Sequence, residues 1–456
     1  MSSAPKHSPH NQHGVRFGNT SLLRTHPLRY LVVIMLLLWI TYCCSSGFRN
    51  PLQPITLSDS NKGSAIRQAM FGSGAIISLT ILYFSRNLGT VLTMNRGTLL
   101  LSVLVPISVL WSAEPKLTIK RSILFLFGLI ILYTITYTSR KPVRKMLQVI
   151  LGSTSAVAFI SLMIHFAFSG AYTVNPMRPG LAGISMHPNT LSPILSVGLI
   201  LSLGLTPDNS RLKVLIRASQ GLIVLCLLLA QSITSLMATF IGCGLFVLLS
   251  SSHYQRGAIQ LLAVSVFTLC SIIGWSNIKS GMFQATGRDE SLSGRDEVWA
   301  IVINEAIKRP IFGRGFGAFW TEGKGRELVQ TWNPRQSHNA YLDLWLDLGI
   351  VGITIFVLNY HALLLRRWLS IRGSAGSAQR KATSALYATS ITYLIIYALG
   401  ESYFLKVDNF VFMTVTWIVL LVGNPDVNCI ENEFANDQSN EMPIDQSPPT
   451  TKQQLL

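Results

Sequence analysis

The chain has 456 residues, of which 49% are hydrophobic and only 12% are charged, with a formal net charge of +17. A water-soluble globular domain carries about 25% charged residues, so this composition excludes a chain that covers its own surface in water. Apolar runs close to the length of about 20 residues that a membrane-spanning helix needs recur along the sequence. We therefore predict an all-α polytopic membrane protein.

The polar arm of residues 1–27 precedes the first apolar run, and we expect it to be a disordered cytoplasmic segment. About twelve transmembrane helices are predicted, helices 1–9 within 28–275 and helices 10–12 within 340–423. Their approximate ranges are 28–47, 69–85, 97–112, 120–138, 146–168, 190–206, 214–231, 235–250, 257–275, 340–364, 384–402 and 408–423. The acidic tail of 424–456 is too polar to form a core, and we expect it to be disordered and cytoplasmic.

Basic residues concentrate in the loops that lie on the same side as the N-terminal arm, for example Arg140, Lys141, Arg144 and Lys145. The positive-inside rule assigns that side to the cytoplasm, so both termini are expected to be cytoplasmic. Much of the net positive charge is then a topology signal that faces anionic lipid. This distribution argues for membrane lipids as partners and against nucleic acid.

The loop of 276–339 is far longer than an ordinary connection, which indicates a functional extracytoplasmic segment. Within it, Trp299, Val302, Ile303 and Ala306 have the spacing of one helix face. Ser293 is a suitable N-cap for this helix, and Pro310 ends it. Residues 313–317 read G-R-G-F-G and predict a hinge or turn. We expect a partly helical lid that docks on the helix bundle.

The lid carries an unusual number of basic side chains for an extracytoplasmic loop. They are Lys279, Arg288, Arg295, Lys308, Arg309, Arg314, Lys324, Arg326 and Arg335. Guanidinium groups match phosphate oxygens in a bidentate fashion, so the set indicates an anionic ligand at the outer face. The alternative for each arginine is a solvated surface position or a pair with a nearby carboxylate.

Arg178 lies in a short outer loop between two predicted spans, where a lone cation beside hydrocarbon needs an anionic partner. That partner is either a distant carboxylate such as Asp347 or a lipid phosphate.

His338 lies at the start of the apolar run that follows the lid. Ser337 is a suitable N-cap, which places His338 and Asn339 in the first helical turn. A helix N-terminus favours anions and disfavours an imidazolium, so we expect an uncharged ring that accepts a proton from a hydroxyl. The alternative is a histidine that only caps the helix or lies at the interface. The remaining histidines have no metal-ligand spacing, so we predict no metal and no cofactor.

Three stretches follow one another in this part of the chain: S-G-R-D-E-V-W, K-R-P-I-F-G-R-G-F-G-A-F-W and S-H-N-A-Y-L-D-L-W-L-D-L-G-I-V-G. With S-V-L-W-S-A-E-P-K (108–116) and R-P-G-L-A-G-I-S-M-H-P-N (178–189), they resemble the O-antigen ligase/polymerase superfamily. The G-F-G-A-F-W segment is most similar to exopolysaccharide polymerases of the succinoglycan type.

The resemblance implies a metal-independent, inverting membrane glycosyltransferase of the bacterial cytoplasmic (inner) membrane. It would polymerise undecaprenyl-pyrophosphate-linked oligosaccharide repeats onto an acceptor glycan, with chain-length regulators and export proteins as further partners. By resemblance, His338 is the base, Arg178 and Arg295 bind the pyrophosphate, and Arg121, Arg314 and Arg335 are further candidates for that binding. The alternatives are a ligase that transfers the glycan to lipid A-core or a protein, and a transporter or flippase of lipid-linked sugars.

Overall fold

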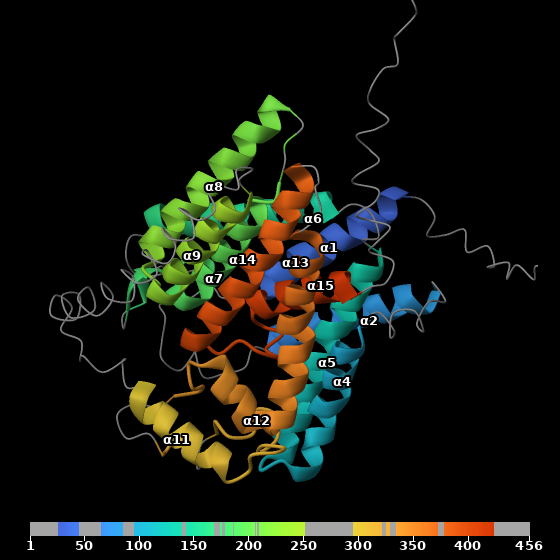
Figure 1. Ribbon diagram of the computed structural model, residues 1–456, viewed down its shortest axis with the longest axis vertical. Helices are drawn as coiled ribbons and strands as arrows, with labels where there is room; N and C mark the ends of the chain where they lie inside the picture. The colour runs from blue at the N-terminus through green and yellow to red at the C-terminus, as the bar shows by residue number, and fades with distance from the viewer. Residues whose placement is uncertain are drawn as a thin grey trace, which may run out of the picture.

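The computed structural model describes residues 26–44, 65–84, 95–138, 143–167, 174–175, 178–185, 187–205, 207, 209–250, 295–321, 325–328, 334–372 and 378–423. Figure 1 shows a bundle of helices with α11 lying across its lower end, beside α12. The chain is mostly helical, as predicted, because a helix satisfies every backbone donor and acceptor within its own segment where no water is present.

Outside residues 174–185, the N-terminal part of the bundle contains nine described helical segments. They are α1 (His26–Cys44), α2 (Ala65–Phe84), α4 (Arg96–Ile107), η2 (Ser108–Trp111), α5 (Pro115–Thr138), α6 (Val143–Ala167), α7 (Pro188–Ser202), α8 (Ser210–Ala230) and α9 (Ile233–Ser250). The C-terminal part contains α11 (Arg295–Ile307), α12 (Ala340–Phe356), the π-helical η4 (Val357–Ala362), α13 (Leu363–Arg372), α14 (Ala378–Gly400) and α15 (Phe410–Gly423).

Each predicted span coincides with a helix except 257–275, which lies outside the described residues. Among the described residues, 6 helices are long and apolar enough to cross a membrane. They are Pro115–Thr138, Lys145–Ala167, Ser210–Ala230, Ile233–Ser250, Ala340–Ser370 and Thr383–Gly400. Shorter apolar helices include Ile34–Cys44, Arg96–Trp111, Pro188–Ser202 and Phe410–Gly423. The protein is therefore a multi-pass helical membrane protein, and the number twelve stays a prediction.

One short sheet lies between α6 and α7, and the sequence did not predict it. Strand β1 (Val174–Asn175) pairs antiparallel with β2 (Arg178–Leu181), and the short 3₁₀ helix η3 (Gly183–Ser185) follows. The hairpin lets the chain turn back into α7, and β2 packs against α8. Gly180 has a φ of 127°, and a Cβ there would lie 2.4 Å from the carbonyl oxygen of Ala230. Only glycine fits this close approach.

The segments predicted to be extracytoplasmic meet at one end of the bundle. Hydrogen bonds and ion pairs there join Cys44 to Val407, Arg67 to Asp408, Trp111 to Phe312, Arg121 to Gly317, Ser232 to Asn189, and His338 to Glu401. Arg96 and Arg211 belong to loops predicted to be cytoplasmic. They lie in the first turns of α4 and α8, at the helix ends farthest from these contacts. Loops of one predicted side thus share one end, which we call the lid end.

Helix α11 of the lid packs on α12 through a face that includes two of the four residues predicted from the sequence. Val298, Val302 and Ala306 are fully buried and form a small core with Phe319 and Trp320. Ile303, which was predicted to face the bundle, is 39% exposed. The predicted face is therefore confirmed for Val302 and Ala306 and wrong for Ile303, and Val298 is buried in addition, because apolar residues on both edges of the stripe made its centre ambiguous.

The glycine turn, residues 310–317, is bound into α12 by backbone hydrogen bonds. The amides of Arg314 and Gly315 donate to the carbonyls of Leu346 and Asp347, at 2.8 and 3.0 Å. In return, the amide of Ile350 donates to the Pro310 carbonyl at 2.9 Å. This exchange is possible because α12 is interrupted at Gly349, where φ is 66° and ψ is −166°. The segment predicted as a hinge or turn is a turn, docked along a broken helix.

Candidate active site

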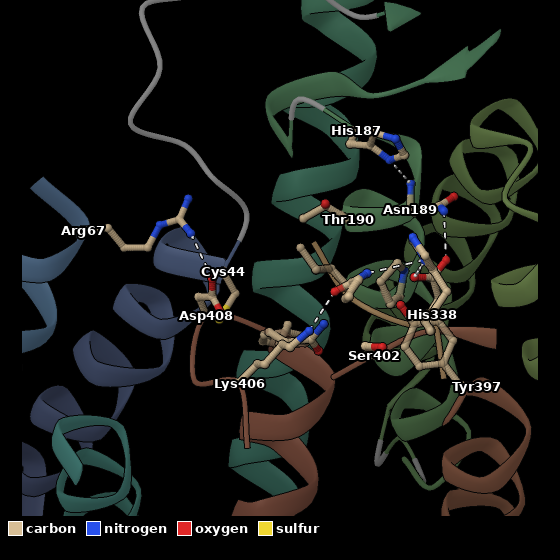
Figure 2. A pocket seen from close by; sticks show the side chains of 16 residues that line it. Cys44, Arg67, His187, Asn189, Thr190, His338, Tyr397, Ser402, Lys406 and Asp408 are labelled. Atoms are coloured by element: carbon tan, nitrogen blue, oxygen red, sulfur yellow. Dashed lines mark hydrogen bonds and ion pairs between the residues drawn. The ribbon is translucent and has the colours of Figure 1, made fainter. Parts of the chain in front are cut away.

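A cavity of about 340 Å³ opens at the lid end, between the start of α7, the loop of 401–409 and the residues just before α12. We call it the His338 cavity. Its polar lining side chains are Arg67, His187, Asn189, Thr190, Gln336, His338, Glu401, Ser402, Lys406, Asp408 and Asn409. Figure 2 shows His338 near His187 and Asn189 on one side, and Arg67 with Asp408 on the other. Segments far apart in the sequence thus supply a single polar cavity.

His338 does not lie in the first turn of α12, which corrects the sequence prediction. The N-cap is Asn339, whose side-chain oxygen accepts hydrogen bonds from the amides of Tyr341 and Leu342 at 3.1 and 3.2 Å. Asparagine caps a helix as well as serine does, and the Ser337 hydroxyl instead bonds to the backbone of Asn339. His338 therefore precedes the helix.

The backbone of His338 has a φ of 55°, in the left-handed region that few residues other than glycine adopt. Neighbouring contacts hold it there. The Ser337 amide donates to the Asp343 carboxylate at 3.0 Å, and the Trp299 indole donates to the Ser337 carbonyl at 2.9 Å. Such conformations persist where the surroundings fix them, and they cluster at functional sites. The lid and α12 together aim the imidazole into the cavity.

Glu401 is the central acidic group of the cavity. It follows α14, and its side chain is only 8% exposed. One carboxylate oxygen lies 3.1 Å from Nδ1 of His338. The other oxygen accepts a hydrogen bond from the Asn189 amide at 2.9 Å and lies 3.6 Å from the Arg295 guanidinium. Glu401 therefore joins α7, the lid helix α11 and the residue before α12.

Asn189 is itself held in place at the start of α7. Its side-chain oxygen accepts a hydrogen bond from the Ser232 hydroxyl at 3.1 Å. Its backbone amide donates to Nδ1 of His187 at 3.0 Å, so His187 caps the helix. The amide nitrogen of the Asn189 side chain is consequently the end that faces Glu401.

Two further cations line the cavity. Lys406 donates a hydrogen bond to the Gln336 side-chain oxygen at 2.7 Å and lies 4.0 Å from the Asp343 carboxylate. Arg67 pairs with Asp408 at 3.3 Å. Lys406 is thus linked to the His338 turn through Gln336, whereas Arg67 lies on the other side of the cavity (Figure 2).

The structure brings one of the predicted arginines close to His338. Arg295 reaches Glu401, as described, although it is not among the residues that line the cavity. Arg121 donates to the Gly317 carbonyl, and Arg314 pairs with Glu305, so both are engaged where the glycine turn docks. Arg335 is exposed just before the His338 turn. The assignment of these arginines to a pyrophosphate stays a prediction.

Arg178 lies in β2, and its side chain falls outside the described residues. The two proposed partners for its guanidinium, Asp347 and a lipid phosphate, therefore both stay open. Asp347 lies in α12 at the glycine turn, where its backbone carbonyl accepts a hydrogen bond from the Gly315 amide.

Sequence reasoning missed Glu401, Asn189 and Lys406 as members of the site. A signal for two of them was present: the short connection between the last two spans reads G-E-S-Y-F-L-K-V-D and holds Glu401, Lys406 and Asp408. Charges beside hydrocarbon are costly and are retained where they have a partner or a function. Asn189 lay within a quoted motif, but nothing in that motif indicated its partner.

The arrangement suits a reaction in which His338 takes a proton from a ligand and negative charge develops on that ligand. An imidazole held by a carboxylate has the geometry of a general base, and cations that line the cavity stabilise negative charge that develops on a ligand. Among the described residues, no group of three or more His, Cys, Asp and Glu side chains is placed to hold a metal ion.

The fold and the cavity define a class of protein: a multi-pass helical membrane protein with a polar, titratable cavity at the end of the bundle where α11 docks. Residues 218–357 match the family model described as O-Antigen ligase. The chain thus carries an O-antigen ligase family domain, and the resemblance to that superfamily is confirmed.

Two curated relatives are similar to parts of the chain. The "Exopolysaccharide production protein ExoQ" of Rhizobium meliloti (strain 1021) is 23% identical over 270 residues, which cover 55% of this chain and 60% of the relative. The "Putative polysaccharide ligase" of Rickettsia bellii (strain RML369-C) is 29% identical over 106 residues, 22% of this chain and 24% of the relative. The chain therefore spans less than two thirds of either relative.

Proposed function

We propose that this protein is a membrane glycosyltransferase that polymerises undecaprenyl-pyrophosphate-linked oligosaccharide repeat units into exopolysaccharide or O-antigen. The observation that carries the proposal is the His338 imidazole, set in a cavity with Lys406 and Arg67, in a chain with an O-antigen ligase family domain. The name of the Rhizobium relative, an exopolysaccharide production protein, favours a polymer as the product.

In the proposed reaction, the imidazole of His338 accepts the proton of an acceptor sugar hydroxyl. The hydroxyl oxygen forms a bond to the anomeric carbon of the donor while the bond from that carbon to the diphosphate breaks. Attack from the face opposite the leaving diphosphate inverts the anomeric centre. The proton ends on His338, and the negative charge leaves with the undecaprenyl diphosphate.

Fixed cations take the part that a metal ion plays in other transferases, so the reaction is proposed to be metal-independent. Arg295 and Arg178 are the first candidates to bind the diphosphate, and Lys406 joins them because it lines the cavity. For Arg121 and Arg314, the same role requires them to leave the docking contacts described above.

We place the cavity at the periplasmic face of the bacterial inner membrane, with both termini in the cytoplasm. The gathering of the predicted extracytoplasmic segments at the lid end supports this orientation, as does the excess of basic residues in the other loops. We expect chain-length regulators and export proteins to act beside the polymerase.

A ligase that transfers a finished glycan to lipid A-core or a protein is the second candidate. The description of the matched family and the name of the Rickettsia relative favour it. Both candidates use the same base and the same leaving group, so they differ in the acceptor. A transporter of lipid-linked sugars is the alternative from another class.

The test is a cell-free assay with purified protein in vesicles and lipid-linked repeat units extracted from cells that lack this protein. A polymerase yields a ladder of lengthened lipid-linked glycans. A ligase leaves the glycan length unchanged and transfers it to added lipid A-core. Movement of labelled lipid across the vesicle membrane without glycan transfer would overturn both assignments in favour of transport.

A further inference from the structure

The carboxylate of Glu401 touches the proposed base directly. Its oxygen lies 3.1 Å from Nδ1 of His338, within the range of a charge-assisted hydrogen bond. The Gln336 amide nitrogen also approaches Nδ1, but at 3.5 Å it is beyond the usual range. The Gln336 amide is a donor and would need a lone pair on Nδ1, whereas the Glu401 carboxylate is an acceptor and needs a proton there. Because the carboxylate is nearer and charged, we assign the proton to Nδ1, which donates its hydrogen bond to Glu401.

This contact fixes the state of the other ring nitrogen. A neutral imidazole has one N–H and one lone pair, and with the proton on Nδ1 the lone pair lies on Nε2. Nε2 is then the nitrogen that accepts the proton of the acceptor hydroxyl. Once it has done so, the resulting imidazolium lies next to the carboxylate, which stabilises its charge.

Glu401 is well suited to this task because its own position is fixed. The Asn189 amide donates to Oε1, and the Arg295 guanidinium lies 3.6 Å from the same oxygen. The other oxygen, Oε2, is the one that lies 3.1 Å from Nδ1 of His338. At 8% exposure the carboxylate has little competition from water.

On the basis of the proposed function, we propose that Glu401 is a positioning residue for the base: it sets the tautomer and orientation of His338. Through its contact with Arg295, Glu401 also links α11 to His338. Glu401 does not touch the reacting atoms and does not take the proton. The network Asn189–Glu401–His338 thus connects α7 to the residue that does the chemistry.

Replacement of Glu401 by glutamine gives a sharp test, because Asn189 leaves only one orientation for the new amide. Its oxygen must face the Asn189 donor, so its NH₂ group faces Nδ1 of His338. Nδ1 becomes the acceptor, the proton moves to Nε2, and the base loses its lone pair. A purely structural role for Glu401 predicts instead that the isosteric Glu401→Gln change is milder than Glu401→Ala.

The experiment measures kcat and KM in the cell-free assay with the extracted lipid-linked repeat units. For Glu401→Gln we expect kcat to fall by about 10²-fold, near the lower end of what general-base catalysis contributes, with KM changed less than threefold. Glu401→Asp should recover part of the loss, and Glu401→Ala should be no worse than glutamine. The matched control is Glu327→Gln, an exposed carboxylate of the lid, which should behave as wild type.

A second arm combines Glu401→Gln with His338→Ala. If Glu401 acts through His338, the double variant is no slower than His338→Ala alone. Three results would each overturn the inference. The first is an equal further loss of kcat when Glu401→Gln is added to His338→Ala. The others, for Glu401→Gln alone, are a rise in KM in place of the fall in kcat, or a kcat within twofold of wild type. If Glu401→Gln does not reach the membrane, Asn189→Ala, which removes only the amide that holds the carboxylate, must lower kcat about tenfold.

The outcome also separates this inference from the proposed function. Full activity of His338→Ala refutes the base itself, and the proposed mechanism falls with it. An inactive His338→Ala together with a fully active Glu401→Gln refutes only the positioning role.

Discussion

Cationic side chains gather in two regions at the lid end of the bundle: the glycine turn and the His338 cavity. At the glycine turn, Arg121 donates to a backbone carbonyl and Arg314 pairs with Glu305, while backbone hydrogen bonds join the turn to α12. In the cavity, Arg67 pairs with Asp408 and Lys406 donates to Gln336, but both cations line open space, with side chains 25% and 35% exposed. The first region uses its charges to dock the lid, whereas the second places its charges on the wall of a cavity.

The difference lies in the partners that the fold supplies. A guanidinium bound to a carbonyl or a buried carboxylate is already satisfied, and a ligand must displace that partner. The partners of Arg67 and Lys406 leave these side chains partly exposed on the cavity wall, where an anion can reach them. Variants in the two regions should therefore separate stability from activity, and the following changes test that separation.

The largest effect is expected for His338→Ala in the cavity. Loss of the base should lower kcat by about 10²- to 10⁴-fold in the cell-free assay, with no change in membrane level or thermal unfolding. His165→Ala, at the end of α6, is the matched control and should keep wild-type activity. Near-normal turnover by His338→Ala would mean that the histidine has no catalytic role and is only part of the turn before α12.

An intermediate effect on stability is expected for Gly349→Ala, where the glycine turn enters α12. An added Cβ would lie 2.1 Å from the Ile311 carbonyl oxygen, at a φ of 66° that alanine disfavours. We expect the free energy of unfolding to fall by about 1–3 kcal/mol, seen as a lower midpoint of thermal unfolding in detergent. Gly221→Ala is the control, since a Cβ there meets nothing within 4 Å. Equal midpoints for the two variants would contradict a docked turn.

The smallest effect is expected for Arg314→Gln. The Arg314–Glu305 pair is partly buried, with side chains 21% and 13% exposed, so its loss should lower the free energy of unfolding by about 1 kcal/mol or less. Glu305→Gln should give a similar decrease, and turnover should fall less than tenfold in both. A large loss of turnover in Arg314→Gln alone, at an unchanged unfolding midpoint, would move Arg314 to the diphosphate and break the comparison.

Much of the helical architecture was predictable from the sequence, because apolar runs bounded by basic loops are a one-dimensional signal. The interruption of α12 at Gly349 was not, since glycine is common in membrane helices and only the approach of Pro310 and Ile311 reveals its use. The β1–β2 hairpin was also missed, because its strands are too short to show an alternating pattern.

Of the candidate site, the sequence indicated the loop that holds His338 and the presence of arginines, but not which arginine lies where. Arg295 and Arg314 belong to the same lid and look alike in sequence, yet one reaches Glu401 and the other Glu305. Glu401 follows His338 by 63 positions, and its pairing depends on how α12 and α14 pack. Long-range partners of this kind have no local pattern.

The order of the chain gives the docked turn a consequence for biogenesis. Pro310 and Ile311 are synthesised before α12. Their carbonyls, which accept the hydrogen bonds of Ile350 and Val351 where α12 is interrupted, are therefore already present when those two residues emerge. Glu401, in contrast, is made only after α13 and α14. The lid can therefore join its helix during synthesis, whereas the ring of His338 meets its carboxylate last, once the bundle is nearly assembled.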